Sequence, residues 1–509
     1  MGEGRMKNIL EMLEKSTALY PEHPALSTGE AYLSYQEVTR QARIIGSAVA
    51  SQTSVRKPVI VYMDHSLDCI VAFLGIVYAN DFYSFFNSEL PDERLRIMAD
   101  TLEADLVITD AHHKEEATAL FTKENVVTFE ELVAGEEDAD LLSSIRNQTI
   151  DTDPLYLNFT SGSTGVPKGV LIGQRSVIDF IPIFDDLFHI THDDILANQA
   201  PFDFDVSVKD IYSTLNVGAT LVLVPRAYFS QPAQLVDFLD EQKVTTMIWA
   251  VSALCLLSVY KALDYKVPAH VNKILFSGEV MPYKHLKNYM DHMPHTMFVN
   301  LYGPTEITCN CLYHIIDPQR DYSTYLPAGK PFPNERVFLL KDDKLVTKTN
   351  EPGEICVTGT ALAIGYYRQP SSQFRQNPLA DGYHEMMYCT GDLAYMNEQG
   401  EFVFRGRKDF QIKYLGHRIE LEEIDHAILE DEHVTRSCSL FDQEKEKLIT
   451  FYIGDIDKRS LKIALIDRLP RFMIPTKMIQ VEDMPLNKNG KIDRKALMEV
   501  YKNANRRHR

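Results

Sequence analysis

Apolar and polar positions follow two periods along most of the chain, one typical of helices and one of short buried strands. Residues 33–49 place apolar side chains at helical spacing, and Ser34 and Glu37 have the spacing of an N-terminal capping box. Residues 59–63 form an apolar run that predicts a buried strand, and residues 69–78 predict the next helix. This alternation predicts a largely parallel sheet with helices on both faces.

The same alternation returns in residues 151–330. There, strands are predicted at residues 220–224 and 246–250, with a helix at residues 235–242 between them. Residues 331–404 differ, because their short β runs are broken by Gly, Pro and Asn. Such a stretch predicts a small barrel-like or antiparallel β subdomain.

Beyond residue 409 helix and strand patterns alternate over shorter distances. The predicted elements are residues 421–429, 437–440, 448–453, 459–468 and 478–482. We expect an α/β fold in which a large N-terminal domain, residues 1–407, holds two parallel-type α/β subdomains and the small β-barrel-like subdomain. A boundary at residues 408–409 then leads to a small α+β C-terminal domain, residues 410–509.

Composition narrows the class of protein. A chain of 509 residues is long enough for two or more domains, and its net charge of −20 argues against a nucleic-acid partner. No apolar run approaches the ~20 residues that span a bilayer, so we expect no membrane insertion. Only Cys309 and Cys311, among seven scattered cysteines, lie close together in the sequence. This predicts reduced thiols in a cytoplasmic protein.

Residues 158–170, NFTSGSTGVPKGV, form a loop rich in glycine and hydroxyl groups between two apolar β-like runs. Glycines let backbone N–H groups turn inward, hydroxyls add donors and Lys168 adds a positive charge, as a polyphosphate requires. The spacing is not that of a Walker A loop. The candidate phosphate-binding residues are Thr160, Ser161, Gly162, Ser163, Thr164, Gly165 and Lys168.

The segment TSGSTGVPKG resembles the phosphate-binding signature of the adenylate-forming enzymes, which include acyl-CoA synthetases, luciferases and amino-acid adenylation domains. That resemblance implies an enzyme, an acid–thiol ligase that uses ATP and Mg²⁺ and releases AMP and pyrophosphate. It also implies further motifs for the base, the ribose and the metal, in a fixed order along the chain.

Residues 300–306, NLYGPTE, resemble the second nucleotide motif of that family. By this resemblance Tyr302 offers a ring for adenine, Thr305 a hydroxyl for phosphate and Glu306 a carboxylate for Mg²⁺. The nucleotide-binding residues expected from the motif are Asn300, Leu301, Tyr302, Gly303, Pro304 and Thr305.

Residues 388–392, YCTGD, resemble the family's ribose motif, in which Asp392 accepts hydrogen bonds from both ribose hydroxyls. The segment FRGR that follows resembles a second nucleotide contact, which implies roles for Phe404 and Arg407. Asp409 matches the hinge residue about which the C-terminal domain rotates between two reactions. Gly416 would then leave room for a thiol-bearing arm.

Near the C-terminus, the segment NKNGKID places Lys491 where the family carries its catalytic lysine. A cation that bridges the attacking carboxylate and the α-phosphate lowers the barrier between two anions.

The segment FDFDVSV, residues 202–208, resembles amino-acid adenylation domains, in which an aspartate holds the substrate α-ammonium group; Asp205 takes that place. By resemblance the other pocket residues are Val206, Lys209, Ser252, Leu275, Ser277, Leu301, Cys309 and Asn310.

The chain resembles stand-alone D-alanine–carrier protein ligases from end to end. This implies a D-alanine-like substrate and a separate carrier protein bearing phosphopantetheine. Three features depart from that pattern: Ser277 replaces a cysteine, Lys209 replaces an apolar residue, and residues 83–87 replace a more usual run. The polar side chains of Ser252, Ser277 and Asn310 keep serine open as the substrate.

Two other interpretations remain open. An acyl-CoA synthetase shares the nucleotide motifs, and Asp205 argues against it. A binding protein on an adenylation fold that has lost activity would not need Glu306 or Lys491. Because the sequence ends within about twenty residues of Lys491 without a carrier-like segment, we expect the carrier to be a separate protein.

Overall fold

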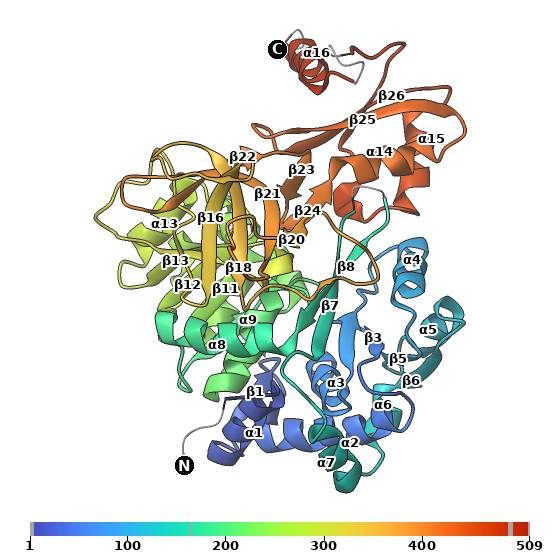
Figure 1. The fold of residues 1–509 in the computed structure, drawn as a ribbon, viewed down its shortest axis with the longest axis vertical. Coiled ribbons are helices and arrows are strands. Elements are labelled where there is room, and N and C mark those ends of the chain that lie inside the picture. Colours follow the sequence, from blue (N-terminus) through green and yellow to red (C-terminus); the bar gives the residue numbers. More distant parts are fainter. Residues whose placement is uncertain (1–4, 163–164, 487–491, 507–509) are drawn as a thin grey trace. The chain divides into compact units, whose positions relative to one another are not determined.

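The structure is a computed structural model that describes residues 5–162, 165–486 and 492–506. The chain divides into two compact units, each with its own hydrophobic core (Figure 1). The first unit comprises Met1–Ser88, Leu102–Asn158 and Gly169–Lys408. The second comprises Glu89–Thr101, Phe159–Lys168 and Asp409–Arg509.

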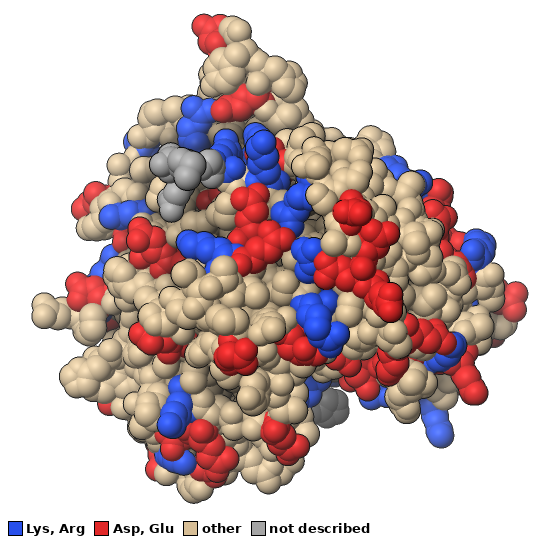
Figure 2. Space-filling model, turned by 90° about the horizontal axis from the view of Figure 1, so that it is seen from below, with Lys and Arg blue, Asp and Glu red and all other residues tan. Residues whose placement is uncertain are grey.

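Charged side chains of both signs are interspersed on the face shown in Figure 2, where the described residues form no continuous basic stripe. None of the helices in the described part of the chain combines the length and the apolar character needed to cross a bilayer.

The larger sheet of the first unit has nine strands. They are β1 (Pro24–Ser27), β2 (Tyr32–Ser34), β9 (Ile195–Asn198), β10 (Thr220–Leu223), β11 (Thr246–Ala250), β12 (Lys273–Ser277), β13 (Met297–Tyr302), β14 (Leu312–Ile315) and β15 (Lys330–Pro331). Their order is β15-β14-β13-β12-β11-β9-β10-β1-β2. Every pair from β13 to β1 is parallel, and β2, β14 and β15 add antiparallel edges.

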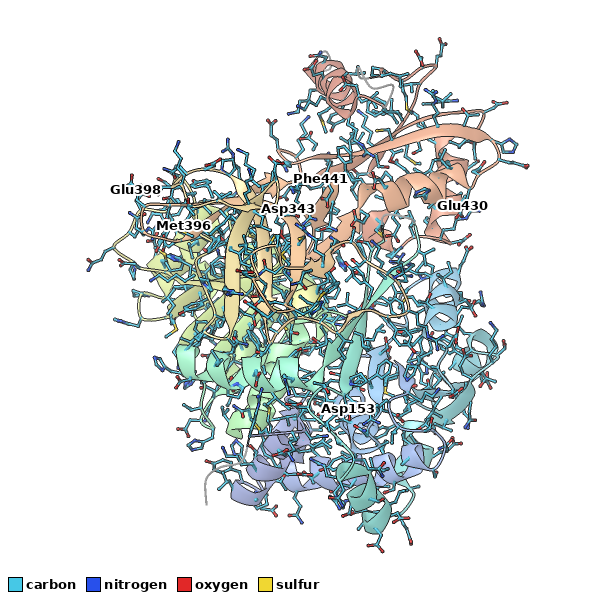
Figure 3. The ribbon with its side chains drawn as sticks, viewed as in Figure 1. Asp153, Asp343, Met396, Glu398, Glu430 and Phe441 are labelled. Atoms are coloured by element: carbon cyan, nitrogen blue, oxygen red, sulfur yellow. The ribbon has the colours of Figure 1, made fainter. Side chains whose placement is uncertain are left out.

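The second sheet of this unit has seven strands. They are β3 (Pro58–Tyr62), β4 (Phe82–Phe85), β5 (Leu106–Thr109), β6 (Asn125–Thr128), β7 (Pro154–Thr160), β8 (Lys168–Gly173) and β19 (Gly365–Tyr366). Their order is β19-β8-β7-β4-β3-β5-β6, and the pairs among β3, β4, β5, β6 and β7 are parallel. Buried Asp153, labelled in Figure 3, lies just before β7 and accepts hydrogen bonds from Arg56 and Asn80.

The two mainly parallel sheets confirm the predicted fold class. Each sheet also contains strands from both the N-terminal part of the sequence and residues 151–330. The N-terminal strands β1 and β2 join the sheet built mostly from residues 151–330, whereas β7 and β8 join the sheet of the N-terminal strands. Periodicity predicts that a strand exists but not which sheet it joins, because both sheets bury both faces of their strands.

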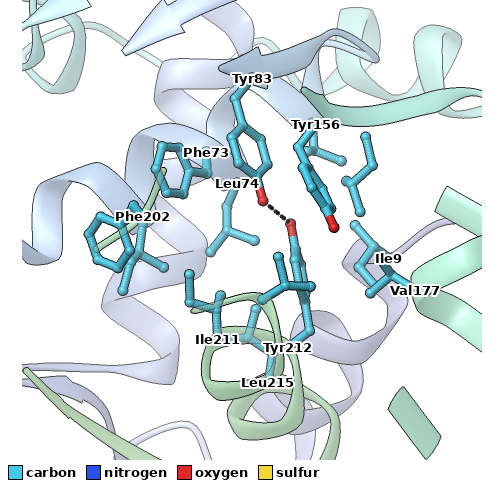
Figure 4. Close-up of a cluster of buried hydrophobic side chains, with 14 of the residues drawn as sticks. Ile9, Phe73, Leu74, Tyr83, Tyr156, Val177, Phe202, Ile211, Tyr212 and Leu215 are labelled. Atoms are coloured by element: carbon cyan, nitrogen blue, oxygen red, sulfur yellow. Dashed lines mark hydrogen bonds between the residues drawn. The ribbon is translucent and has the colours of Figure 1, made fainter. Parts of the chain in front are cut away.

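Helices pack on these sheets. They are α1 (Leu10–Leu19), α2 (Tyr35–Ala50), α3 (Leu67–Tyr78), α5 (Lys114–Leu120), α6 (Phe129–Val133), α7 (Ala139–Arg146), α8 (Gln174–Phe188), α9 (Val206–Val217), α10 (Pro232–Glu241), α11 (Val251–Val259), α12 (Ala262–Tyr265) and α13 (Tyr283–His292). Nearly every residue of α3 is buried, so this helix lies inside the core. Figure 4 shows Phe73 of α3 against Tyr83, with ring centroids 4.2 Å apart, and the hydroxyls of Tyr83 and Tyr212 joined at 3.0 Å.

The predicted small β subdomain is an antiparallel sheet. Its strands are β16 (Glu335–Lys341), β17 (Lys344–Leu345), β18 (Gly353–Gly359), β20 (Phe374–Gln376), β21 (Met386–Met396) and β22 (Phe402–Arg407). They follow the order β17-β16-β18-β21-β20, and β22 also pairs with β21. All these pairs are antiparallel. The first unit ends at Lys408, directly after β22.

The C-terminal part of the second unit has the predicted α+β character. Its elements are β23 (Gln411–Tyr414), β24 (His417–Glu420), α14 (Leu421–Leu429), β25 (Val434–Asp442), β26 (Lys447–Gly454), α15 (Lys458–Ile466), β27 (Lys477–Gln480) and α16 (Arg494–Arg506). Strands β25, β26 and β27 form one sheet, β23 and β24 form a hairpin, and α4 (Asp92–Leu102) lies almost wholly in the same unit.

The N-terminus of α2 forms one of the two hydrogen bonds of the predicted capping box. The Ser34 side chain accepts a hydrogen bond from the Glu37 N–H at 3.3 Å, as predicted. The second half of the expected capping box is different, because the Glu37 carboxylate accepts hydrogen bonds from Arg40 and Gln41. An arginine one turn along the helix is a charged donor that outcompetes the backbone N–H.

We expect Ser34→Ala to lower the free energy of unfolding by about 0.5–2 kcal/mol, because the first turn of α2 loses its side-chain cap. Ser66 provides a matched control, since it holds the same position at the start of α3 without a side-chain cap bond. Urea unfolding of Ser34→Ala, Ser66→Ala and the unsubstituted protein measures the difference. Equal losses in the two variants would show that the Ser34 hydrogen bond does not stabilise α2.

Candidate active site

The predicted ammonium anchor, Asp205, lies at the N-cap position of α9 but makes no capping hydrogen bond. Its backbone carbonyl accepts a hydrogen bond from the Cys309 thiol at 3.0 Å. The Asp205 carboxylate therefore does not cap the helix, although aspartate at this position commonly does.

Lys209, one turn along α9, is completely buried, and its Nζ donates to Asn310 Oδ1 at 2.6 Å. Burial lowers the pKa of Lys209, while Cys309, Asp205 and Asp210 act in the opposite direction. Four of the residues predicted to surround the substrate, Asp205, Lys209, Cys309 and Asn310, thus lie together.

The other predicted pocket residues come from one edge of the nine-stranded sheet. Ser277 ends β12, Leu301 lies next to the end of β13, and Ser252 follows β11 by two residues. Because β11, β12 and β13 are parallel neighbours, their carboxyl ends meet at the same edge. Leu275 and Leu301 belong to the same core cluster as Val208 and Ile211 of α9, and Val206 begins that helix.

Tyr302, Asp392 and Arg407 come together from three strands, although 105 positions separate the first from the last (407 − 302). The Tyr302 hydroxyl donates to Asp392 Oδ2 at 2.5 Å, and Arg407 donates to Asp392 Oδ1. Asp392 and Arg407 are direct partners across the β21–β22 pair. Arg407 also donates to the Thr390 carbonyl at 3.2 Å. The expected base and ribose motifs therefore share one carboxylate, while Phe404 is half-buried on β22.

Asn300 of the same motif donates from its side-chain amide to the Pro327 carbonyl at 2.7 Å. A Cβ on Gly303 would lie 2.5 Å from the Asn310 Cα, so glycine is required where the two segments cross. Thr305 and Glu306 follow Pro304 in a short 3₁₀ turn, Thr305–Ile307. Glu306 is completely buried and accepts a hydrogen bond from the Tyr366 hydroxyl at 2.7 Å.

The expected phosphate-binding loop lies in the second unit. A Cβ on Gly162 would lie 1.9 Å from the Val166 carbonyl oxygen, and Gly165 has φ +85°, so both positions require glycine. The Thr160 hydroxyl donates across the loop to the Lys168 carbonyl at 3.4 Å. Ser163 and Thr164 lie outside the described residues.

Within that unit the loop contacts groups that the sequence did not single out. The Ser161 hydroxyl donates to the Arg418 carbonyl at 2.9 Å, and the Gly162 N–H donates to the Glu423 carboxylate at 3.2 Å. A cavity of about 350 Å³ lies beside the loop, between residues of α4 and α14. A backbone N–H of this loop can therefore bind an anionic oxygen, as a phosphate site requires.

The remaining predictions concern the hinge and the C-terminal lysine. Asp409 Oδ1 accepts a hydrogen bond from the Gln411 N–H at 3.3 Å. Leu415 and Gly416 have φ values of +52° and +81°, which the two-residue turn between β23 and β24 requires. Lys491 lies outside the described residues, so its role remains a prediction.

With this geometry in view, the family model described as "AMP-binding enzyme" matches residues 13–367, more than half of the chain. The chain belongs to the AMP-binding enzyme family. It is thus an adenylate-forming enzyme. The match includes the phosphate loop, Asp205, Tyr302 and Glu306, while Asp392 lies beyond it.

Curated relatives of this adenylate-forming enzyme differ greatly in length. D-alanine–D-alanyl carrier protein ligase of Bacillus cereus (strain B4264) is 29% identical over 512 residues, covering 96% of this chain and 99% of the ligase. Bacitracin synthase 1 of Bacillus licheniformis is 29% identical over 507 residues, covering 98% of this chain. The chain spans only 9% of that synthase, and it spans 45% of tyrocidine synthase 1 of Brevibacillus parabrevis, to which it is 28% identical.

The fold is also that of solved adenylation proteins. The structure of holo-PA1221, an NRPS protein containing adenylation and PCP domains bound to a vinylsulfonamide inhibitor, has a TM-score of 0.84 to this chain. The match covers 97% of this chain and 84% of the PA1221 chain, with 21% sequence identity.

Outside these motifs, Glu354, Cys356 and Cys389 form a group with metal-ligand chemistry. The two sulfurs are 3.7 Å apart across β18 and β21. Cations already occupy the group, because Arg375 Nε donates to Cys389 Sγ at 3.3 Å and Lys408 pairs with Glu354 at 2.7 Å. Arg375 pairs in turn with Asp343, which Figure 3 labels. A divalent metal ion would have to displace both cations, so this group does not fit one.

Asp210, beside Lys209, is a second buried charge in α9. Asn198 donates to its Oδ2 at 2.7 Å, its Oδ1 has no hydrogen-bond partner among the described residues, and burial raises its pKa to about 8. The folded protein therefore holds a proton on Asp210 that the unfolded chain loses above about pH 4. Stability from this group falls as the pH rises between those two values.

We accordingly expect Asp210→Asn to flatten that fall, so that the variant gains stability relative to the unsubstituted protein at pH 8 but not at pH 4. Asp193→Asn is the control, since Asp193 has 85% of its side chain exposed. Urea unfolding at the two pH values measures the effect. A pH dependence that is the same in all three proteins would show that Asp210 is ionised in the folded state.

Proposed function

We propose that this adenylate-forming enzyme activates a small amino acid and transfers it to the phosphopantetheine thiol of a carrier protein. The full-length similarity to a D-alanine–D-alanyl carrier protein ligase supports D-alanine as the first candidate and supports a carrier as the partner. Ser252, which follows β11, and Ser277, the last residue of the neighbouring strand β12, support serine as the second candidate.

The placement of Asp205 is the observation that carries this proposal. Its carboxylate makes no capping bond in α9, and the residues beside it come from the edge where ligands of parallel sheets bind. An α-ammonium group is the natural partner of a half-buried carboxylate. Fatty and aryl acids lack that group, so Asp205 favours an amino acid.

The nucleotide would be held by the groups described above. Asp392, positioned by Tyr302 and Arg407, suits a ribose diol, because a carboxylate accepts two hydrogen bonds in parallel. Glu306 supplies the hard oxygen that Mg²⁺ prefers, and Tyr366 fixes the orientation of its carboxylate.

The proposed reaction has two steps. First, a carboxylate oxygen of the amino acid attacks the α-phosphorus of ATP, and the bond to the β-phosphate oxygen breaks as pyrophosphate leaves. Lys491 would neutralise the charge that these two anions bring together. Second, the carrier thiolate attacks the acyl carbon, and the bond to AMP breaks.

We expect Lys491→Ala to reduce amino-acid-dependent ATP–pyrophosphate exchange by at least about 100-fold, because the cation between the two anions is lost. ATP binding should change much less. Lys488→Ala, three residues earlier, is the matched control and should retain exchange. Equal exchange in Lys491→Ala and the unsubstituted enzyme would exclude this role for Lys491.

We expect Asp205→Asn to raise the KM for the amino acid by about 30-fold or more, since the ammonium group loses its counter-charge. Asp203→Asn, two residues earlier, is the matched control. Steady-state adenylation kinetics with ATP held saturating measure both. Unchanged kinetics in Asp205→Asn, together with faster thioester formation on coenzyme A than on a carrier protein, would favour an acyl-CoA synthetase instead.

A further inference from the structure

Lys209 carries a buried positive charge whose hydrogen-bond acceptor, among the described residues, is a neutral amide. None of its side chain is exposed, and its ammonium group has three donors. One of them bonds to the Asn310 amide oxygen at 2.6 Å. Asp205 and Asp210 act on this charge electrostatically, while the hydrogen-bond acceptor found for Lys209 Nζ among the described residues is a neutral amide. The ammonium group therefore has donors to spare for a further acceptor.

The other buried lysine in the described part of the chain shows the usual arrangement. Lys273 Nζ lies 2.7 Å from Asp194 Oδ1 and also bonds to the Asn272 side chain at 3.0 Å. Its charge is thus paired within the protein, as buried charges generally are. Lys209 differs in having an amide where Lys273 has a carboxylate.

The position of Lys209 indicates what would pair with it. Asp205 and Lys209 are four residues apart at the start of α9, so their side chains leave the same face of the helix. They present a negative group and a positive group about one helical turn apart. An amino acid with an acidic side chain carries the two complementary charges, an ammonium group and a second carboxylate, at a similar separation.

We propose that the amino acid activated by this enzyme has an acidic side chain, of the size of aspartate or glutamate, whose carboxylate binds the Lys209 ammonium group. This inference rests on the proposed function, because it takes Asp205 as the anchor of the α-ammonium group. Asn310 then holds Lys209 Nζ in place and leaves its charge for the substrate.

Other small substrates match the pair less well. The alanine methyl group would face an ammonium group with two unused donors, which is costly in a buried site. The serine hydroxyl could accept one hydrogen bond but would leave the charge unpaired. Asparagine has the shape of aspartate without its charge, so it separates charge recognition from size.

The test is amino-acid-dependent ATP–pyrophosphate exchange with the D- and L-forms of aspartate, glutamate, asparagine, serine and alanine. We expect an acidic amino acid to exceed asparagine, serine and alanine by at least about 30-fold in kcat/KM, the loss that follows removal of one member of a buried charge pair. Lys209→Met should abolish that preference, so that aspartate or glutamate no longer exceeds asparagine in kcat/KM. Asn310→Ala should weaken the preference while Lys209 is retained.

Thermal unfolding provides a readout that does not need turnover. Aspartate or glutamate, with ATP present, should raise the Tm of the unsubstituted enzyme and not that of Lys209→Met. The contrary result is that alanine or serine proves the best substrate, with the order of substrates unchanged in Lys209→Met. That result would overturn the inference of an acidic substrate and leave the proposed function standing. If no amino acid supports exchange although ATP binds, the proposed function and this inference both fail.

Discussion

The carboxyl ends of β9, β11, β12 and β13 meet at one edge of a sheet because these strands are parallel neighbours. Hydrogen bonding between parallel strands leaves no other arrangement, and the segments that follow the strands must start from that edge. The residues proposed to surround the amino acid all depend on this constraint. Helix α9 adds Asp205 and Lys209, since it begins shortly after β9 ends.

A second constraint is electrostatic. The first turns of α9 completely bury two ionisable side chains, Lys209 and Asp210. The protein neutralises Asp210 by keeping its proton, with a pKa of about 8. Lys209 keeps its charge beside an amide oxygen, with Asp205 one turn away on the same helix. Neighbouring positions on one helix thus meet the cost of a buried charge in different ways, because successive side chains point in different directions.

Much of the fold could be predicted from the sequence. Alternating apolar runs predicted parallel sheets, and broken β runs predicted the antiparallel subdomain. The motif around Tyr302 and that around Asp392 also predicted a shared site, and the two side chains are 2.5 Å apart. The fold predictions succeeded because each rests on a local pattern, whereas the binding role of Tyr302 and Asp392 stays a prediction.

Contacts between distant segments could not be predicted in the same way. Nothing in the spacing of Cys356 and Cys389 indicates that β18 and β21 would place them side by side. Glu423 likewise resembles any other acidic residue in the first turn of a helix, yet it accepts the Gly162 N–H. Pairings of this kind depend on register and on loop geometry, which local periodicity does not contain.

The same limit explains why Lys209 was an anomaly in the sequence and is informative in the structure. A lysine in a pocket for alanine is costly, so the sequence could only set it against the expected substrate. The contact with Asn310 changes the question, because an amide orients the ammonium group without cancelling its charge. A carboxylate at position 310 would have made Lys209 a closed structural pair like Lys273 and Asp194. An amide instead leaves donors of the Lys209 ammonium group for the carboxylate of a ligand, and a site of this kind rejects a substrate that lacks the matching group.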